Sequence, residues 1–595
     1  MRLFFTSLIL TLCASAHAQT AGWLSKTSSE LRPALLAGQK VDCIVWMRDQ
    51  ADLSAARDRR GKLRKGEYVF ETLRVHAAQT QSRVLDALNG YAANSFYLVN
   101  AIAVAQADRA LIERLCALPE VARIAPDPWS YFEGAYTEAP VGATGRSGVE
   151  WGVQRINAPL VWDMGHRGQG VSIGGADTGY EWAHPAIKSA YRGYFAPTDT
   201  VDHNYNWHDA IYEQSPLNSN PDNPCGFAIK TPCDDNAHGT HTAGTFVGVD
   251  TSGIHIGVAP EARWVGCRNM ERGWGRPSSY IECFEWFLAP TDLNSQNPRP
   301  DLAPEVINNS WYCADSEGCD NEDIVAIMRT AVGNLKAAGI FVVVSNGNFG
   351  ASCATTFGPP AYFPESFSVG ATRMDDTLAA FSSVGPVVYP IDTFLKPDVS
   401  APGQGIRSCV GRNNDLGTFG YSNFSGTSMA GPHVAGAVAL ILSAAPGLKG
   451  EVETLEQIIR ESAKPMYADR ECQGFSGMDM PNYLYGWGRI DVAAAVALAL
   501  SLSQEDVPAP APFALFPNPV SAGQDLYFSV AAAATAGRWE LFDALGRPVL
   551  SKTVVRGQDQ RIALPGQLAS GIFFWRWQDE RGGVSGILSV VGERR

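Results

Sequence analysis

The sequence of 595 residues is poor in positive charge and in histidine. It has 47 lysines and arginines against 61 acidic residues, ten histidines and a formal net charge of -14. Such a chain lacks the basic surface that polyanions bind, so we expect no nucleic-acid partner. It contains neither a Cys-x-x-Cys unit nor a Cys/His cluster. Because structural zinc sites are built from such groups, we expect no zinc and assign no metal ligands.

Long apolar runs are also scarce. Residues 3–16 are apolar, follow Met1 and Arg2, and lead into Ala-His-Ala at 16–18. A charged start, an apolar run and small residues at the end are typical of a secretory signal, so we expect residues 1–18 to be removed after Ala18. The alternative, a membrane anchor, needs roughly 20 apolar residues. We expect no later segment to span a bilayer.

Twelve cysteines in an exported chain favour disulfides, although Cys13 would leave with the signal. Two close pairs lie in loop-like sequence, and these are the bridges we predict: Cys225 with Cys233, and Cys313 with Cys319. The alternative is that the cysteines are buried free thiols.

The length predicts three or four folding units. Residues 19–128 mix helix and strand patterns and predict a small α+β unit, in which we interpret the basic run 57–65 as a solvated helix face rather than a binding site. Residues 129–148 show no period and predict an exposed linker, the kind of segment that proteases cut. Within the first unit, strands are predicted at 41–46, 95–104 and 121–124, and helices at 52–89 and 108–118.

Residues 149–502 alternate short β-branched runs with amphipathic stretches. Strands that lack strict polar alternation and are separated by helices predict an α/β fold, with a parallel sheet covered by helices on both faces. Strands are predicted at 171–176, 264–268, 306–309, 340–345 and 366–371, and helices at 238–249, 279–288, 323–338 and 433–445.

A proline-rich linker at 503–512 separates this unit from residues 513–595. The last segment has turn-bounded strand patterns and predicts a small β-sandwich. Its strands are predicted at 526–530, 539–542, 561–564 and 572–577.

Residues 426–433 read GTSMAGPH, so Ser428 lies in a glycine-flanked turn just before an apolar run. A serine becomes a nucleophile only with a base, a group that orients the base, and donors for an oxyanion. Asp177 follows the predicted strand 171–176, at the carboxyl end where open α/β sheets bind ligands. His238 begins the next helical stretch. We therefore predict Ser428 as nucleophile, His238 as general base and Asp177 as the residue that orients it.

Two donors are predicted for the oxyanion. A helix start at Ser428 would direct its own backbone N–H and the positive end of the helix dipole toward the developing charge. Asn348 follows the predicted strand 340–345 and would add its side-chain amide. The alternatives are that Ser428 is a helix cap and Asn348 a turn residue.

The order Asp, His, Ser and the surrounding sequence resemble the subtilisin-like serine proteases of the peptidase S8 family. The resemblance covers most of 151–498 and is closest to the bacillopeptidase F type. It implies a serine endopeptidase that acts on proteins or peptides through an acyl-enzyme, is secreted or held at the cell surface, and requires no cofactor. The motifs are DTG at 177–179, HGTHTAGT at 238–245, GVAP at 257–260, GN at 347–348, GTSMAGPH at 426–433, YRGY at 191–194, NNSW at 308–311 and YFPESF at 362–367.

Neighbouring residues compete for the catalytic roles. The resemblance selects His238 over His241, which we interpret as structural, and we interpret His433 as an ordinary helix residue. Asp234 and Asp235 are interpreted as shaping or charging the approach to His238.

The alternative function is a catalytically idle adhesin or binding protein on the same scaffold. An esterase with a nucleophile elbow is excluded, because Met429 and Ala430 replace the x-Gly that should follow the serine and because the chain order differs.

The substrate-binding residues follow from the resemblance and its departures. Members of the family carry Ser-x-Gly on a substrate-lining strand, whereas Tyr312 follows Ser310 and Trp311 here. We expect Tyr312 to narrow the primary pocket, with Phe349 beside it and Gly358 at its floor, and we expect an apolar side chain to be preferred. The full prediction is Ser310, Trp311, Tyr312, Gly347, Phe349, Gly358, Gly273 and Gly275.

The two glycines at 273 and 275 are interpreted either as an edge strand that pairs with extended substrate or as a surface turn. Family members often carry structural calcium, but residues 250–255 do not reproduce the asparagine-rich loop that binds it. We therefore assign no calcium ligands.

The flanking units also carry resemblances. Residues 19–128 resemble the inhibitory prodomain of subtilases, which implies a self-inhibited zymogen that is cut within 129–148. Residues 513–595 resemble the carboxyl-terminal sorting domain of type IX secretion, through motifs at 516–519, 541–547 and 568–573. This implies export through the periplasm of a Gram-negative-type bacterium, with the secretion machinery as partner. The alternative is an accessory β-domain that binds carbohydrate or protein.

Overall fold

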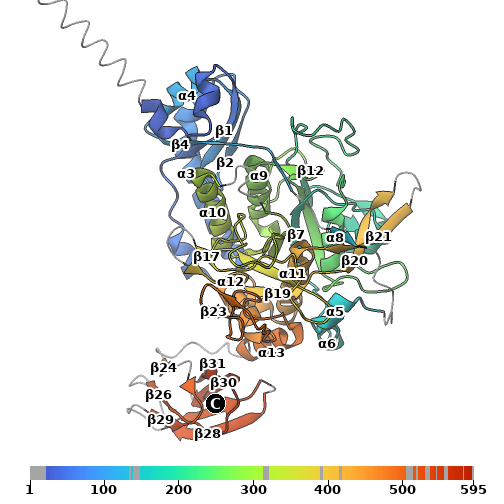
Figure 1. Cartoon of the computed structure of the whole chain (residues 1–595), viewed down its shortest axis with the longest axis vertical. Helices are drawn as coiled ribbons and strands as arrows, with labels where there is room; N and C mark the ends of the chain where they lie inside the picture. The colour runs from blue at the N-terminus through green and yellow to red at the C-terminus, as the bar shows by residue number, and fades with distance from the viewer. Residues whose placement is uncertain are drawn as a thin grey trace, which may run out of the picture.

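The computed structural model shows three successive units along the chain (Figure 1). It describes residues 22–132, 136–138, 148–312, 320–388, 393–413, 418–503, 514–516, 520–529, 537–544, 546–554, 560–579 and 582–591. The predicted signal at 1–18 and the pair Cys313 and Cys319 lie outside the described residues.

A seven-stranded parallel sheet forms the centre of the middle unit, and the predicted α/β class is confirmed. The predicted strands are present within one residue of their expected bounds. Two edge strands were not predicted, because they are short and lack a β-branched run. In sheet order the strands are β10 (Trp207–Asp209), β11 (Arg263–Arg268), β7 (Ser172–Asp177), β14 (Val306–Asn309), β15 (Phe341–Ser345), β16 (Phe367–Thr372) and β19 (Val399–Pro402).

Alternate side chains of these strands point to opposite faces. Val306 and Val343 belong to one apolar core, which helices α8 (His238–Val247) and α11 (Thr427–Ala444) cover. Ile307 and Val342 belong to a second core, covered by α9 (Pro277–Leu288) and α10 (Glu322–Ala337). The helices therefore lie on both faces of the sheet, as predicted.

Helix α11 begins at Thr427, six residues before the predicted start at 433, because Pro432 lies inside the helix instead of before it. It is the one described helix that is long and apolar enough to cross a membrane, but 89% of the apolar window is buried inside the protein. Its composition reflects its position in the core.

The N-terminal unit is a four-stranded sheet in the order β2-β3-β1-β4, with helices α3 (Lys62–Leu88) and α4 (Arg109–Cys116). The single strand predicted at 95–104 is in fact two antiparallel strands, because the chain reverses at Asn100, whose φ is +43°. The strands are β1 (Val41–Met47), β2 (Ala93–Phe96), β3 (Ala101–Ala107) and β4 (Val121–Pro126).

This unit shares an apolar core with the middle unit. Phe70, Phe96 and Leu98 pack in the same cluster as side chains of α9 and α10. Figure 1 shows the N-terminal unit resting on these two helices.

The C-terminal unit consists of two sheets around one small core, as expected for a β-sandwich. Leu526 and Ile562 come from one sheet, and Trp539, Leu541 and Trp575 from the other. The first sheet holds β24 (Ala514–Phe516), β26 (Asp525–Ser529) and β29 (Gln560–Ala563), and the second β25 (Val520–Ser521), β31 (Gly582–Val591), β30 (Gly571–Asp579), β27 (Gly537–Phe542) and β28 (Pro548–Val554).

Short strands occur in the stretch predicted as a linker. β5 (Ser130–Tyr131) pairs with β13 (Trp274–Gly275), and β6 (Tyr136–Glu138) pairs with β21 (Thr418–Ser425). Strands of two or three residues produce no periodic signal, and their partners lie far away in the sequence.

The remaining helices and strands are short or peripheral and belong to the middle and N-terminal units. They are α2 (Arg32–Leu36), α5 (Trp151–Arg155), α6 (Ala158–Asp163), α7 (Pro185–Lys188), β8 (Tyr194–Phe195), β9 (Thr200–Val201), β12 (Met270–Glu271), β17 (Val387–Val388), β18 (Thr393–Phe394), β20 (Ile406–Asn413), α12 (Val452–Ser462), β22 (Glu471–Cys472), β23 (Phe475–Ser476) and α13 (Val492–Ser503), with short 3-10 turns between some of them.

Three disulfides join described residues. Cys225–Cys233 is the predicted bridge, whereas Cys267–Cys283 and Cys353–Cys472 were not predicted because their partners are far apart in sequence. Among the described cysteines, Cys43, Cys116 and Cys409 are buried thiols, so both outcomes considered for the cysteines occur in this chain.

Candidate active site

The carboxyl ends of three neighbouring strands carry the predicted site residues. β7 ends at Asp177, Ser310 directly follows β14, and Asn348 lies three residues after β15. Since β14 pairs with both β7 and β15 in parallel register, these residues leave the sheet side by side. This is the edge at which open α/β sheets bind ligands.

Asp177 and His238 form a buried hydrogen-bonded pair. His238 Nδ1 lies 2.8 Å from Asp177 Oδ1, and the two residues are 1% and 0% exposed. Asp177 Oδ1 also accepts from the Thr178 N–H at 2.8 Å. Because the carboxylate accepts from Nδ1–H, the neutral ring carries its lone pair on Nε2. Nε2 is buried and has no hydrogen-bond partner within the described part of the protein.

Asp234 fixes the start of α8 on which His238 lies. Its carboxylate accepts from the Thr240 N–H and hydroxyl, at 2.9 and 2.6 Å, and from the Thr178 hydroxyl at 2.9 Å. Thr178 follows Asp177, so one carboxylate connects both partners of the pair. Burial raises the pKa of Asp234.

Asp235 points to a different neighbour, although it adjoins Asp234 in sequence. Its carboxylate pairs with the buried Arg268 guanidinium and accepts from the Arg272 N–H. Burial raises its pKa to about 6. Asp235 therefore supports the loop between β11 and β13 rather than His238.

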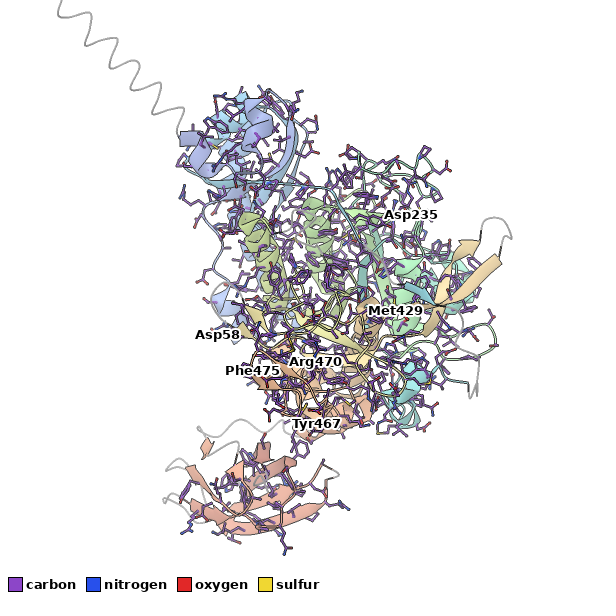
Figure 2. All side chains as sticks on the ribbon, viewed as in Figure 1. Asp58, Asp235, Met429, Tyr467, Arg470 and Phe475 are labelled. Carbon is purple, nitrogen blue, oxygen red and sulfur yellow. A yellow bond between two sulfur atoms is a disulfide. The ribbon has the colours of Figure 1, made fainter. Side chains whose placement is uncertain are left out.

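Ser428 is the second residue of α11 and is 1% exposed. Its hydroxyl donates to the Ser310 carbonyl oxygen at 3.0 Å, and the Ser310 hydroxyl donates to the Ser428 carbonyl oxygen at 2.8 Å. These reciprocal bonds hold the start of α11 against the end of β14. Met429, the next residue, lies in the interior of the middle unit (Figure 2).

The Ser428 hydroxyl thus makes no hydrogen bond to His238 Nε2 in this arrangement. A rotation about χ1, between staggered positions, separates the observed bond from one directed at a base. Such catalytic hydrogen bonds commonly tighten only when substrate is bound.

The orientation of the Asn348 amide is fixed by Thr427. Asn348 Oδ1 accepts from both the N–H and the hydroxyl of Thr427, each at 2.9 Å. Two donors must face an oxygen, so the NH₂ group points the other way. Asn348 Nδ2 is buried without a hydrogen-bond partner among the described residues. It is a donor left available beside Ser428.

Glycine at position 347 permits the turn that places Asn348 beside Ser428. Its φ is +104°, and a Cβ there would lie 2.9 Å from the Ser383 hydroxyl oxygen. A larger residue would strain the turn that carries Asn348.

Neither competing histidine joins the pair. His241 Nε2 lies 3.0 Å from the Ile406 carbonyl oxygen, its ring stacks on Phe424, and burial lowers its pKa to about 3. His433 Nδ1 lies 2.8 Å from the Met429 carbonyl oxygen within α11, and burial lowers its pKa to about 4. Both rings are bound to backbone in the core.

The predicted pocket residues separate into two groups. Trp311 is fully buried, stacks on Tyr280 at 4.2 Å and donates to the Ala176 carbonyl oxygen, so its side chain faces the core. Tyr312 instead packs against Phe349 at 4.8 Å between ring centroids. Phe349 in turn packs against Phe357, the residue before Gly358, at 4.4 Å.

Gly273 and Gly275 lie beside β5, where the chain's own residues run along the site. Trp274 and Gly275 pair with Tyr131 and Ser130, and the Phe132 N–H donates to the Gly273 carbonyl oxygen at 2.8 Å. The Phe132 ring packs edge-on against the His238 ring at 4.9 Å. Sequence reasoning missed Phe132 and Thr427, because neither belongs to a periodic pattern. The position of Thr427 next to Ser428 was the only available signal.

Within the described ranges, no three His, Cys, Asp or Glu side chains gather in a way that would hold a metal ion. In the loop considered for calcium, Asp250 is already used by the protein. It accepts from Ser252 and Ile254 and pairs with Arg407 at 3.0 Å. Residues 250–255 therefore do not fit a calcium site.

Comparison with known proteins assigns the chain to one protein family. The model of the subtilase family matches residues 168–488, more than half of the chain. Bacillopeptidase F of Bacillus subtilis is 34% identical over 500 residues, which cover 78% of this chain but 32% of that protein. Subtilisin NAT of Bacillus subtilis subsp. natto is 30% identical over 378 residues, covering 63% of this chain and 79% of that protein. Serine protease AprX of Bacillus subtilis is 36% identical over 235 residues, or 36% and 51% of the two chains.

Proposed function

The chain belongs to the subtilase family of serine proteases, and we propose that it is an endopeptidase with Asp177, His238 and Ser428 as its catalytic triad. The observation that carries the proposal is the buried hydrogen bond between Asp177 and His238 at the carboxyl edge of the sheet. His238 Nε2 has no hydrogen-bond partner among the described residues, so it is placed to act as the base.

The reaction follows from these atoms. His238 Nε2 takes the proton of the Ser428 hydroxyl while Oγ attacks the carbonyl carbon of the peptide bond. The oxyanion that forms accepts hydrogen bonds from Asn348 Nδ2 and the Ser428 N–H. His238 then gives its proton to the leaving amine, and water hydrolyses the acyl-enzyme with His238 again as base. Asp177 holds the tautomer and stabilises the charged ring throughout.

The second candidate is a binding protein that keeps the fold without the chemistry. The bond from Ser428 to the Ser310 carbonyl oxygen is the observation that favours it, since the hydroxyl is turned away from His238. A reagent that modifies only activated serines separates the two candidates.

We expect a fluorophosphonate to label the mature wild-type protein on Ser428 and to leave Ser428→Ala unlabelled. Because only a serine with a working base reacts, mass spectrometry of the labelled peptide identifies the nucleophile. Ser443, which donates to a backbone carbonyl in the same helix, provides the control: Ser443→Ala should label normally. Correctly matured wild type that takes no label would overturn the proposal.

Asn348→Ala is expected to lower kcat about a hundred- to a thousandfold with little change in KM, because its amide would act on the transition state. The magnitude is the one known for this donor in subtilisin itself. Steady-state kinetics on a peptide substrate measure it. A rise in KM with unchanged kcat would assign Asn348 to ground-state binding instead.

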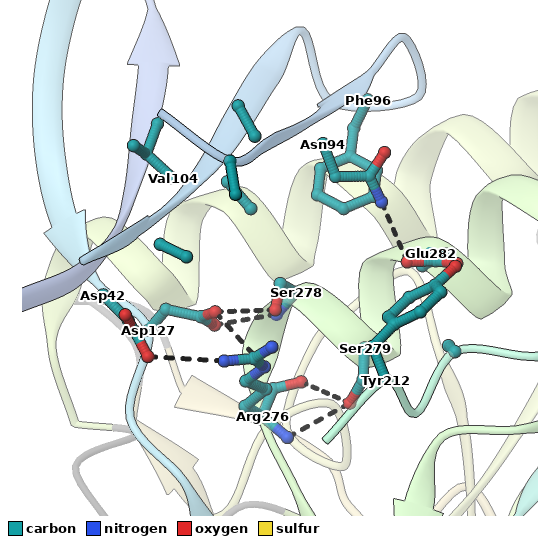
Figure 3. Close-up of a pocket in the computed structure, with 15 residues that line it drawn as sticks. Asp42, Asn94, Phe96, Val104, Asp127, Tyr212, Arg276, Ser278, Ser279 and Glu282 are labelled. Carbon is teal, nitrogen blue, oxygen red and sulfur yellow. Dashed lines mark hydrogen bonds and ion pairs between the residues drawn. The ribbon is translucent and has the colours of Figure 1, made fainter. Parts of the chain in front are cut away.

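We further propose that residues 19–128 form an inhibitory prodomain. Three contacts support this. Directly after these residues, β5 and Phe132 lie against the candidate site. Asp127 accepts from the Ser278 N–H and hydroxyl at 2.9 and 2.6 Å, at the start of α9. Beside it, the Arg276 guanidinium reaches Asp42 at 3.5 Å (Figure 3), on the wall of an interface cavity of about 260 Å³.

Self-processing within 129–148 is part of this proposal. β5 and β6 pair with two different elements beside the candidate site, β13 and β21, and the latter ends three residues before Ser428. The bond to be cut then lies between Phe132 and Tyr136. In the labelling experiment, Ser428→Ala should also remain at full length, whereas maturation of that variant in isolation would contradict self-processing.

Glu285 connects prodomain docking to pH. Its carboxylate accepts from the Leu98 N–H at 2.7 Å, across the interface. Burial, with the nearby Glu282 carboxylate, raises the pKa of Glu285 to about 8. In the released middle unit we expect a surface glutamate with an ordinary pKa near 4.3. The docked state thus binds the extra proton, so docking is strongest below about pH 4.5 and weakens as the pH rises to about 8.

Inhibition by a separately added prodomain should therefore weaken between roughly pH 5 and 8, by up to about tenfold per pH unit from this group. Glu285→Gln mimics the protonated acid. A plot of the logarithm of the inhibition constant against pH should therefore have a slope smaller by about one for this variant than for the wild type. Asp127, whose pKa is also raised by burial, supplies a remaining dependence of the same sign. An unchanged slope in Glu285→Gln would contradict this assignment.

Export completes the proposal. We propose that residues 1–18 direct the chain out of the cytoplasm and that residues 513–595 sort it through type IX secretion to the cell surface or medium. Support comes from the sequence motifs and from the separate core of the C-terminal unit.

Deletion of residues 513–595 is expected to leave the enzyme in the periplasm. Because the C-terminal unit has its own core, the middle unit should still fold and label with fluorophosphonate. Fractionation of cells followed by labelling measures both. Normal export of the labelled, truncated protein would favour an accessory binding domain.

A further inference from the structure

The turn that carries Asn348 rests on a second stretch of the chain, residues 381–385. The Ser383 N–H donates to the Gly347 carbonyl oxygen at 3.0 Å, and the Phe349 N–H donates to the Ser383 hydroxyl at 3.1 Å. These two bonds flank Asn348 on either side in the sequence. The position of its amide therefore depends on where residues 381–385 lie.

Residues 381–385 are backed by a small apolar core of their own. The Gly385 N–H donates to the Tyr483 carbonyl oxygen at 3.0 Å, which joins this stretch to a later part of the chain. The core is distinct from the two large cores of the middle unit. Its buried members are Val384, Cys472, Leu484 and Tyr485.

Residues 466–487, which supply most of this core, are held from one side. Their strands β22 and β23 pair with each other and with no other described strand. Phe475, on β23, is 56% exposed, so the outer face of the hairpin lies in water. Because so few side chains are buried here, apolar packing alone gives the core little stability.

The Cys353–Cys472 disulfide closes this small core. Cys353 follows Asn348 by five residues, and its neighbour Ala354 donates its N–H to the Gly385 carbonyl oxygen at 2.9 Å. The two cysteines are 119 residues apart in sequence. In the loop-closure account, a bridge over such a distance removes much freedom from the unfolded chain. The bridge thus ties the turn of Asn348 and its support to the same core.

We propose that the Cys353–Cys472 disulfide positions Asn348 and that its reduction by a dithiol slows turnover. The inference rests on the proposed protease function, in which the Asn348 amide stabilises the oxyanion. Such a donor must be held within about 0.5 Å of its productive place. A loosened support therefore lowers the rate before it unfolds the protein. The two cysteines act through the turn and not on the substrate.

Reduction of the bond is a two-electron exchange. A thiolate of the dithiol attacks the sulfur of Cys353, the S–S bond breaks, and Cys472 leaves as a thiolate that takes up a proton. The second thiol of the reagent then displaces Cys353, which is protonated in turn, and the reagent closes its own disulfide. Cys353 is half-buried and thus partly open to a reagent, whereas the bridged Cys267 and Cys283 are both 0% exposed.

The test compares the mature wild type with a double variant, Cys353→Ser with Cys472→Ser. We expect kcat on a peptide substrate to fall about ten- to a hundredfold, which is part of the loss expected for Asn348→Ala. In the Asn348→Ala background, the same two substitutions should lower kcat by less than about twofold, because the donor that they position is already gone. A general loss of stability would instead lower kcat by the same factor in both backgrounds.

The Cys225–Cys233 bridge provides the matched control, because both of its cysteines are half-buried like Cys353. With Cys225→Ser and Cys233→Ser, Asn348→Ala should still lower kcat by its full factor. Reduction of this control variant with dithiothreitol decides the matter if the first double variant does not fold. Its kcat should then fall in step with the fraction of Cys353 that mass spectrometry finds alkylated, and recover on reoxidation.

Unchanged kcat in the reduced enzyme would overturn the inference, as would equal losses with and without the Asn348 amide. In both outcomes the wild type still takes fluorophosphonate label, so the proposed function stands. Wild type that takes no label and cleaves neither casein nor peptides would overturn the proposed function, and the inference with it.

Discussion

Strands β7, β14 and β15 run parallel in neighbouring positions, and this register is the constraint from which the site follows. It brings Asp177, Ser310 and the turn to Asn348 out of the sheet at one edge. Helix α11 must then start at the same edge, which the two bonds between Ser310 and Ser428 secure. A shift of one residue in any strand would turn alternate side chains to the opposite face and separate these groups.

Two buried polar atoms of the site lack a hydrogen-bond partner among the described residues, as do atoms elsewhere in the core such as Thr372 Oγ1 and His433 Nε2. The two site atoms are His238 Nε2 and Asn348 Nδ2, both buried without a hydrogen-bond partner in the described part of the chain. An unsatisfied buried donor or acceptor costs about 1–3 kcal/mol, and the fold supports these two through Asp177 and Thr427. A peptide carbonyl placed between them would provide the missing partner for Asn348.

The parts of the fold that were predictable have a local cause. Buried parallel strands read as β-branched runs, so β14 and β15 were found, and the motif around Ser428 placed this residue at the start of a helix. The failures have distant causes. β5 and β6 exist because partner strands are present, Cys267 meets Cys283 only after β11 and α9 pack, and nothing in the sequence near Phe132 indicates His238. Of the candidate site, residue types and order were predictable, whereas the rotamer of Ser428 and the position of Phe132 beside His238 were not.

In the proposed zymogen, residues 130–132 lie where a substrate of the protease would bind. While residues 130–132 remain joined to the middle unit, the segment is held at an effective concentration in the millimolar range, so modest affinity keeps His238 covered. Once the connection is cut, occupancy depends on the interface alone, which includes an apolar core shared with α9 and α10. In this proposal, a segment that fits the site well is both a good substrate for the first cut and a good inhibitor after it. Release, in the same proposal, depends on the interface, where the half-buried Glu285 carboxylate accepts from the Leu98 N–H.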